Sequence, residues 1–140
     1  MDKAYYRVLG VDYGDVRIGL ALSDLTRTIA SPFETYTRKN TEADLKYLAD
    51  LINEKQVKVV VFGLPLNMDG SEGVRVEKTK KFAVKLSQLV DCKIEFNDER
   101  LSSVSAENIL LSADVSRAKR KQVIDKLAAT IILQEYLDAQ

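Results

Sequence analysis

The spacing of apolar residues in the first part of the chain is typical of β-strands. Residues 6–12 are rich in Val and Leu and end in a turn composition, Asp-Tyr-Gly-Asp, at residues 12–15. Residues 17–23 alternate cleanly between apolar and other positions, and residues 28–36 alternate more weakly. Pro32 interrupts the third pattern, so we expect that strand at an edge of the sheet. Because the connections are short, the three strands should form an antiparallel meander.

Two helix–strand units follow the meander. In the first, Thr41 is the expected N-cap, with Asp44 at the capping-box spacing, of a helix with one apolar face. The strand after it, residues 57–62, is almost continuously apolar and β-branched, which is typical of a strand buried on both faces of a parallel sheet. The second unit joins a helix over about residues 72–90 to a short strand at residues 93–97.

Two more helices are expected near the end of the chain. Ser102 or Ser103 can cap a helix that reaches about Leu111, and Ser116 can cap the longest helix, which reaches about Asp138. The apolar stripe expected on this last helix consists of Ile124, Leu127, Ala128, Ile131 and Ile132. Together the elements predict one α/β domain over residues 1–140. Its mixed five-stranded sheet has three antiparallel strands, then two parallel strands, and helices on both faces.

The composition narrows the chemistry that this chain can perform. It has no histidine and one cysteine, Cys92. These counts exclude a Ser-His-Asp triad, a histidine-ligated zinc site, a cysteine cluster for zinc and an intrachain disulfide. Carboxylates remain for metal binding, and they prefer hard ions such as Mg²⁺ or Mn²⁺. No apolar run approaches the ~20 residues of a membrane span, and no signal-peptide pattern is present, so we expect a cytoplasmic protein with no membrane partner.

The overall charge gives little support for binding to nucleic acid, but its distribution leaves that role open. Lys and Arg total 21, as do Asp and Glu, so the formal net charge is zero. A dedicated nucleic-acid-binding domain usually carries a basic excess. The basic residues nevertheless gather in two runs, at residues 78–85 and 117–121. On charge alone, these runs fit solvated helix faces as well as they fit nucleic-acid contacts.

Acidic residues occupy positions where the pattern predicts core or a strand end. Asp12 ends the first strand, Asp98 and Glu99 follow the strand at residues 93–97, and Asp125 borders the apolar stripe of the last helix. Ligands of open α/β sheets bind beyond the carboxyl ends of the strands. Three inward-leaning carboxylates there suit a two-metal phosphodiesterase, whose metals orient the scissile phosphate and activate water.

Each acidic residue also has a plainer interpretation. Asp12 can cap a turn, Asp98 and Glu99 can be a solvated loop pair, and Asp125 can pair with a nearby lysine or arginine. A shared metal site also depends on the distance between the strands that carry Asp12 and Glu99. If another strand separates those that carry Asp12 and Glu99, their backbones are about 9–10 Å apart. Both side chains must then lean toward a shared metal.

Four sequence blocks, in order and at the expected spacing, resemble the YqgF/RuvX family. The blocks are GVDYG at residues 10–14 with RIGLALSD at 17–24, GLPLN at 63–67, DERLSS at 98–103 and IDKLAA at 124–129. Members of this RNase H-like family are described as Holliday junction resolvases and as pre-16S rRNA nucleases. The resemblance covers nearly the whole chain. It implies an RNase H-like mixed sheet and metal-dependent cleavage of phosphodiester bonds, in 5′ processing of pre-16S rRNA or in resolution of Holliday junctions.

The resemblance also implies particular site residues. It assigns the catalytic acids, which would hold Mg²⁺ or Mn²⁺, to Asp12, Glu99 and Asp125, with Asp98 as a substitute for Glu99. Asp15 departs from the family pattern, which often has a small hydroxyl residue there, and an added acid can either weaken the approach of a phosphate or add a contact to the metal. Residues expected to contact the nucleic acid are Arg17, Arg100, Lys80, Lys81, Arg117, Arg120 and Lys121.

The plainer alternatives for the two arginines stay open. Arg17 can instead form a salt bridge at the sheet edge, and Arg100 can orient Glu99. The loop at residues 64–73 is longer than most β–α connections and can fold over substrate. The expected partner is precursor rRNA or branched DNA, and a two-fold symmetric junction would favour a homodimer.

Two other functions compete with the nuclease. One is a non-catalytic RNase H-like module that binds nucleic acid or ribosome-assembly partners. Binding of divalent metal by the three acids would separate this module from the enzyme. The other is an ATPase, because the Asp-x-Gly turn at residues 12–14 also resembles the first phosphate loop of actin-like ATPases and sugar kinases. Those proteins need two such domains, and this chain has one copy of the motif.

Overall fold

The computed structural model describes residues 5–65, 72–98 and 117–140, with residues 117–123 described by their backbone alone. Five strands form one sheet in the order β3-β2-β1-β4-β5. The strands are β1 (Arg7–Tyr13), β2 (Arg17–Ser23), β3 (Ala30–Thr37), β4 (Val57–Leu64) and β5 (Lys93–Asp98). The described helices are α1 (Thr41–Glu54), α2 (Val74–Ser87) and α4 (Arg117–Asp138).

The sheet has the predicted mixture of strand directions. β1, β2 and β3 pair antiparallel, whereas β4 runs parallel to β1 and β5 runs parallel to β4. β3 is an edge strand, as the proline predicted, and Pro32 lies opposite Ala21 where the register between the two strands shifts. The helix predicted to start at Ser102 or Ser103 lies outside the described residues.

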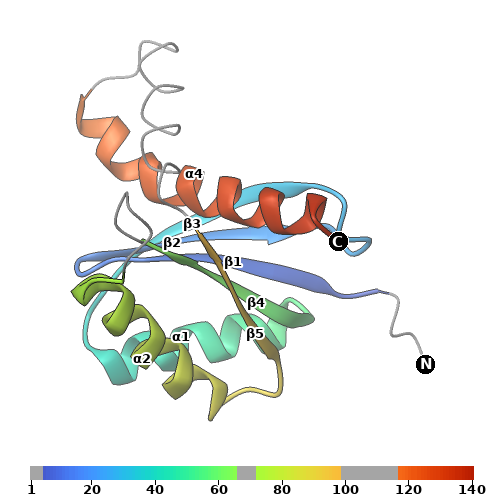
Figure 1. The fold of residues 1–140 in the computed structure, drawn as a ribbon, viewed down its shortest axis with the longest axis horizontal. Coiled ribbons are helices and arrows are strands. Elements are labelled where there is room, and N and C mark those ends of the chain that lie inside the picture. The colour runs from blue at the N-terminus through green and yellow to red at the C-terminus, as the bar shows by residue number, and fades with distance from the viewer. Residues whose placement is uncertain (1–4, 66–71, 99–116) are drawn as a thin grey trace.

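Helices cover both faces of the sheet, with α4 on one face and α1 and α2 on the other (Figure 1). Alternation along β1 divides its side chains between the two layers. Leu9, Val11 and Tyr13 belong to the core beneath α1 and α2, whereas Val8 belongs to the core beneath α4. Asp12 has the parity of Val8 and therefore faces α4.

The apolar face of α4 differs from the predicted stripe. Ala128 and Ile132 are buried as expected, but Ile124, Leu127 and Ile131 are only half-buried. The fully or largely buried residues of the helix are Ala128, Ala129, Ile132, Leu133 and Leu137. The helix is thus rotated so that Asp125, four residues before Ala129, lies in line with the buried stripe rather than at its border.

The start of α1 also differs from the prediction by one residue. Asn40 is the N-cap, because its side-chain oxygen accepts a hydrogen bond from the Ala43 N–H at 2.8 Å. Thr41 is the first helical residue, so its assignment as N-cap was wrong. Asp44 is buried and accepts a hydrogen bond from Arg38 Nε at 2.8 Å instead of completing a capping box on Thr41.

Within the described ranges, no helix combines the length and the apolar character that crossing a membrane requires.

Candidate active site

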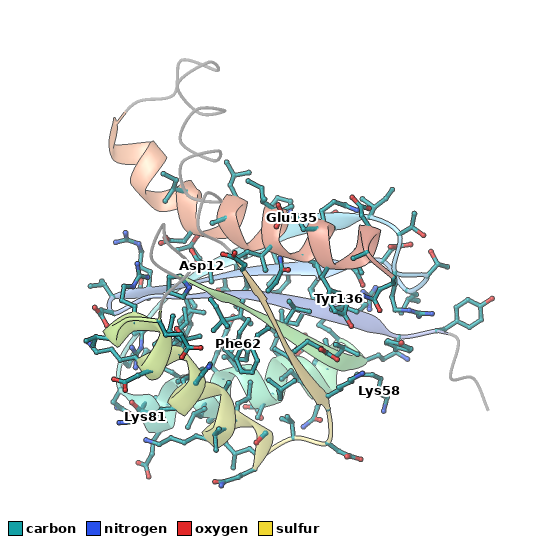
Figure 2. All side chains as sticks on the ribbon, in the orientation of Figure 1. Asp12, Lys58, Phe62, Lys81, Glu135 and Tyr136 are labelled. Carbon is teal, nitrogen blue, oxygen red and sulfur yellow. The ribbon has the colours of Figure 1, made fainter. Side chains whose placement is uncertain are left out.

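Asp12 is a buried carboxylate near the end of a central strand. It is the last residue but one of β1 and is 9% exposed. Figure 2 shows Asp12 between the sheet and α4. The fold thus places an acidic side chain in the interior, where a carboxylate needs polar or charged neighbours.

A glycine brings α4 close to Asp12. Gly19 is the direct cross-strand partner of Asp12, so the two positions share one face of the sheet. A Cβ at Gly19 would overlap the carbonyl oxygen of Asp125 and would lie 2.9 Å from the Asp125 Cβ. Directly opposite Cβ positions are roughly 5 Å apart, which puts the Asp12 and Asp125 Cβ atoms within roughly 8 Å of each other. The backbone therefore brings these two predicted acids together.

A second glycine fixes the position of α4 along the sheet. A Cβ at Gly10 would lie 2.8 Å from the Leu133 Cβ and 2.9 Å from the Ala129 carbonyl oxygen. Gly10 is two residues before Asp12 on the same strand and the same face. The two close backbone contacts, at the carbonyls of Asp125 and Ala129, are about one turn of helix apart. They prevent α4 from sliding along the sheet and so hold Asp125 beside Asp12.

Arg17 contacts the second of these acids. Its Nε lies 2.7 Å from Oδ2 of Asp125, and the two side chains are 38% and 19% exposed. A salt bridge was the alternative to a phosphate contact for Arg17, and the structure contains one, but with the helix rather than along the sheet edge. Within the described ranges, this contact uses the Nε of Arg17 and not its two Nη groups.

The third predicted acid lies beyond the described residues. Glu99 and Arg100 follow directly on the last residue of β5, Asp98, and β4 separates β5 from β1. β4 is therefore the intervening strand considered above, and it separates the backbones of β1 and β5 by about 9–10 Å. Most of the loop expected to fold over substrate, residues 66–71, also lies outside the described part.

Strand alternation distinguishes Asp98 from its neighbours. Asn97 faces α4, because its Nδ2 donates to the Glu135 side chain at 3.2 Å and to the Ile132 carbonyl oxygen at 3.5 Å. Asp98 has the opposite parity and therefore points to the face that α1 and α2 cover. Asp12 and Asp98 thus lie on different faces of the sheet.

Two of the three acids predicted to bind metal, Asp12 and Asp125, lie among the described residues. No group of three or more Asp, Glu or Cys side chains suited to a metal ion occurs in the parts of the chain that the structure describes. Asp12 and Asp125 nevertheless converge beneath α4, and one of them is buried. Paired carboxylates in such a setting fit a hard divalent cation, which would compensate for the charge that the fold places there.

Five of the seven basic residues predicted to contact nucleic acid come from two helices on opposite faces of the sheet. Lys80 and Lys81 lie in the middle of α2, where Lys80 pairs with Glu72 at 3.0 Å and Lys81 is exposed (Figure 2). Arg117, Arg120 and Lys121 lie in the first turns of α4, before Asp125. Their side chains are outside the described part of the structure.

A largely buried ion pair between Arg38 and Asp44 supports the β1–β2 turn, and it was not predicted from the sequence. Arg38 donates to the Gly14 carbonyl oxygen at 3.2 Å and to Asp44 at 2.8 Å. Burial alone would raise the pKa of Asp44, but hydrogen bonds from the Lys39 N–H and from Arg38 outweigh it and lower that pKa. A helix residue with an acidic side chain gives no sequence signal of this contact. For Gly19 there was a signal, because a glycine inside an alternating strand indicates a close backbone approach.

Comparisons with known proteins agree with this arrangement. The model of the RuvX family, described as Holliday junction resolvase, matches residues 6–139. A protein of Halothermothrix orenii named "Putative pre-16S rRNA nuclease" is 50% identical over 134 residues, which cover 96% of each chain. A protein of Halalkalibacterium halodurans with the same name is 49% identical, over 96% of this chain and 97% of its own.

Solved structures show the same fold at low sequence identity. Thermus thermophilus RuvC, in complex with a Holliday junction substrate, has a TM-score of 0.61 at 11% identity and covers 96% of this chain and 95% of its own. The fowlpox virus resolvase, in complex with Holliday junction DNA, has a TM-score of 0.61 at 12% identity, with coverage of 95% and 97%. The family match spans nearly the whole chain, and the chain therefore belongs to the RuvX family of Holliday junction resolvases.

Proposed function

We propose that this chain is a metal-dependent nuclease that hydrolyses phosphodiester bonds in structured nucleic acid. The proposal rests on the closeness of Asp12 and Asp125 at the contact between α4 and the sheet. The close approach of Asp125 to Gly19 brings the two acids together. Two carboxylates held close together repel each other, and a bound divalent cation would stabilise this arrangement.

We assign the metal ligands to Asp12, Asp125 and Glu99. The first two are supported by their geometry, and Glu99 by the sequence resemblance and by the parity of β5, which turns Asp98 away from Asp12. A hard divalent cation, Mg²⁺ or Mn²⁺, would orient the scissile phosphate and lower the pKa of the attacking water. The chain supplies the rigid positions of the ligands, since β1 fixes Asp12 and the docking of α4 fixes Asp125.

Arg17 would serve two purposes in this site. Its Nε holds one oxygen of Asp125, and its two Nη groups can donate to the phosphate in a forked arrangement. Arg100, Lys80 and Lys81 of α2, and Arg117, Arg120 and Lys121 of α4 would contact flanking phosphates, which position a nucleic acid without reading its sequence. With no histidine in the chain, proton transfer would fall to water or to a nearby lysine.

The relatives favour precursor rRNA as the substrate. Proteins about half identical to this chain are named for pre-16S rRNA, whereas the junction resolvases of known structure share 11–12% of its residues and support the fold alone. We therefore place processing of the 5′ end of pre-16S rRNA ahead of Holliday junction resolution. Either substrate would place the activity in the cytoplasm.

Cleavage of two labelled substrates tests the proposal. A pre-16S rRNA 5′ segment and a four-way DNA junction are incubated with Mg²⁺, Mn²⁺ or EDTA, beside the Asp12→Asn variant. We expect metal-dependent cutting of the rRNA segment that the variant lacks. Cutting of the junction alone would move the substrate to branched DNA. Binding of either substrate in EDTA without cutting in any metal would contradict the nuclease and favour the non-catalytic binding module.

A further inference from the structure

The turn between β1 and β2 lies one residue beyond Asp12, and two basic residues of α2 contact it. Arg75 Nη2 donates to the Tyr13 carbonyl oxygen at 3.4 Å, and Lys78 Nζ lies 3.4 Å from Asp15 Oδ1. Figure 1 shows the first turns of α2 beside the β1–β2 end of the sheet. Two basic side chains of α2 thus lie at the end of β1 that carries Asp12.

Arg75 and Lys78 make only weak interactions with the rest of the protein. Arg75 is exposed, and no carboxylate within the described ranges forms a salt bridge with it. Lys78 and Asp15 are 53% and 63% exposed, and an exposed pair of this kind contributes little to stability. An incoming anion can therefore displace Asp15 from Lys78 at small cost.

We propose that Arg75 and Lys78 form a phosphate-binding surface for the nucleic acid that flanks the scissile bond, and that Asp15 competes with the phosphate for Lys78. The guanidinium supplies a planar pair of donors and the ammonium a mobile point charge, the two chemistries that bind phosphodiester backbones. The inference rests on the proposed function, and it adds a surface to the residues already assigned to substrate.

The carboxylate of Asp15 should weaken the binding of phosphate to this surface. This carboxylate lies on the turn that follows the end of β1, three residues after Asp12, and Lys78 is its ion-pair partner. While the pair is intact, Lys78 contributes less positive charge to the approach path, and Asp15 repels the backbone. Removal of the Asp15 charge should therefore strengthen binding, and that gain should depend on Lys78.

The test measures binding of the full chain to the labelled rRNA segment and to the labelled junction, in EDTA, over a range of salt concentrations. The variants are Arg75→Gln, Lys78→Gln, Asp15→Asn and the double variant Asp15→Asn/Lys78→Gln. Lys58→Gln is the matched control, because Lys58 is exposed at the opposite end of the sheet (Figure 2). Cleavage of the same substrates in Mn²⁺ is recorded in parallel.

We expect Arg75→Gln and Lys78→Gln each to reduce the slope of log affinity against log salt by about 0.7–0.9, the value of one phosphate contact. Asp15→Asn should tighten binding roughly twofold to fivefold, and the double variant should lose that gain. Lys58→Gln should bind as the wild type does.

Wild-type slopes in both α2 variants, with wild-type cleavage intact, would overturn this surface and leave the nuclease standing. A wild-type chain that neither binds nor cuts would overturn both. A tightening by Asp15→Asn that persists in the double variant would overturn the competition for Lys78.

Discussion

The carbonyl oxygen of Asp125 occupies the space that a side chain on Gly19 would need, so the backbone of α4 lies directly on β2 at this point. Gly19 pairs with Asp12 across the strands, and the same contact therefore sets the separation of the two acids. A single close approach between a helix and a strand builds this half of the site. Its consequences can be tested by changing the glycine, the acids or the arginine that pairs with Asp125.

Substitution of Gly19 should separate the two acids. In Gly19→Ala the new methyl group must push α4 away, at a cost of about 1–3 kcal/mol in the free energy of unfolding. We expect cleavage to fall by far more than stability explains, because Asp125 moves with the helix. The matched variant is Gly10→Ala, which disturbs the docking of α4 at Ala129 and Leu133, farther from Asp125.

Urea denaturation and cleavage rates, both measured well below the melting temperature, compare the two glycine variants. Equal loss of cleavage in Gly10→Ala and Gly19→Ala would mean that general helix docking, and not the local approach to Asp12, governs the activity.

Loss of Arg17 should impair the reaction while the fold is retained. Because the Arg17–Asp125 pair is partly exposed, Arg17→Gln should cost less than about 1 kcal/mol in stability. Cleavage should fall at least about tenfold, with a smaller loss in Arg17→Lys, which keeps the charge without the forked donors. Lys46→Gln is the control, since Lys46 forms an exposed pair with Asp50 on α1. Wild-type cleavage by Arg17→Gln would remove Arg17 from the site.

The buried pair of Asp44 and Arg38 should make stability depend on acid. The pKa of Asp44 is lowered in the folded chain, so the pair stabilises the fold fully above the unfolded value of about 3.9. That stabilisation is lost as the pH falls through the folded value. Asp44→Asn should therefore lower the free energy of unfolding at pH 7 by about 3–5 kcal/mol. Below about pH 4, the free energy of unfolding of this variant should fall less steeply with decreasing pH than that of the wild type.

Urea denaturation between pH 2 and pH 7 checks this prediction. Asp50→Asn, at an exposed position, should stay within about 0.5 kcal/mol of the wild type throughout. An Asp44→Asn variant with wild-type stability at pH 7 and an unchanged acid decline would contradict the role assigned to the pair.

The choice between Asp98 and Glu99 can be made by paired substitutions. Asp98 faces away from Asp12, so Asp98→Asn should retain most of the cleavage activity. Glu99→Gln should lose it, by about the 10²-fold or more that removal of an electrostatic group from a site typically costs. Single-turnover cleavage of the preferred substrate measures both. If Asp98→Asn lost cleavage activity and Glu99→Gln retained it, the third ligand would be Asp98. The Asp98 side chain would then have to point to the α4 face of the sheet.

Much of the fold could be predicted from the sequence because local patterns determine it. Strict alternation defined β2, the continuous β-branched run defined β4, and Pro32 placed β3 at an edge. These are properties of single segments, and they require no knowledge of what packs against them.

The features that could not be predicted depend on contacts between distant segments. Hydrophobicity alone favoured Ile124 and Ile131 for the buried face of α4, but the close approach at Gly10 and Gly19 selects the narrower face that includes Ala129. That rotation places Asp125 directly over the sheet. The pairing of Arg17 with Asp125 could not be predicted either, because the two residues are 108 positions apart in the chain.

The central claim is that Asp12 and Asp125 are ligands of one divalent cation site. Electron paramagnetic resonance of Mn²⁺, titrated into the wild-type chain and into Asp12→Asn and Asp125→Asn, tests it without reference to any substrate. We predict saturable Mn²⁺ binding by the wild type and a large loss of affinity in each variant, while circular dichroism shows the folds unchanged. Mn²⁺ binding of wild-type affinity in both variants would contradict the claim.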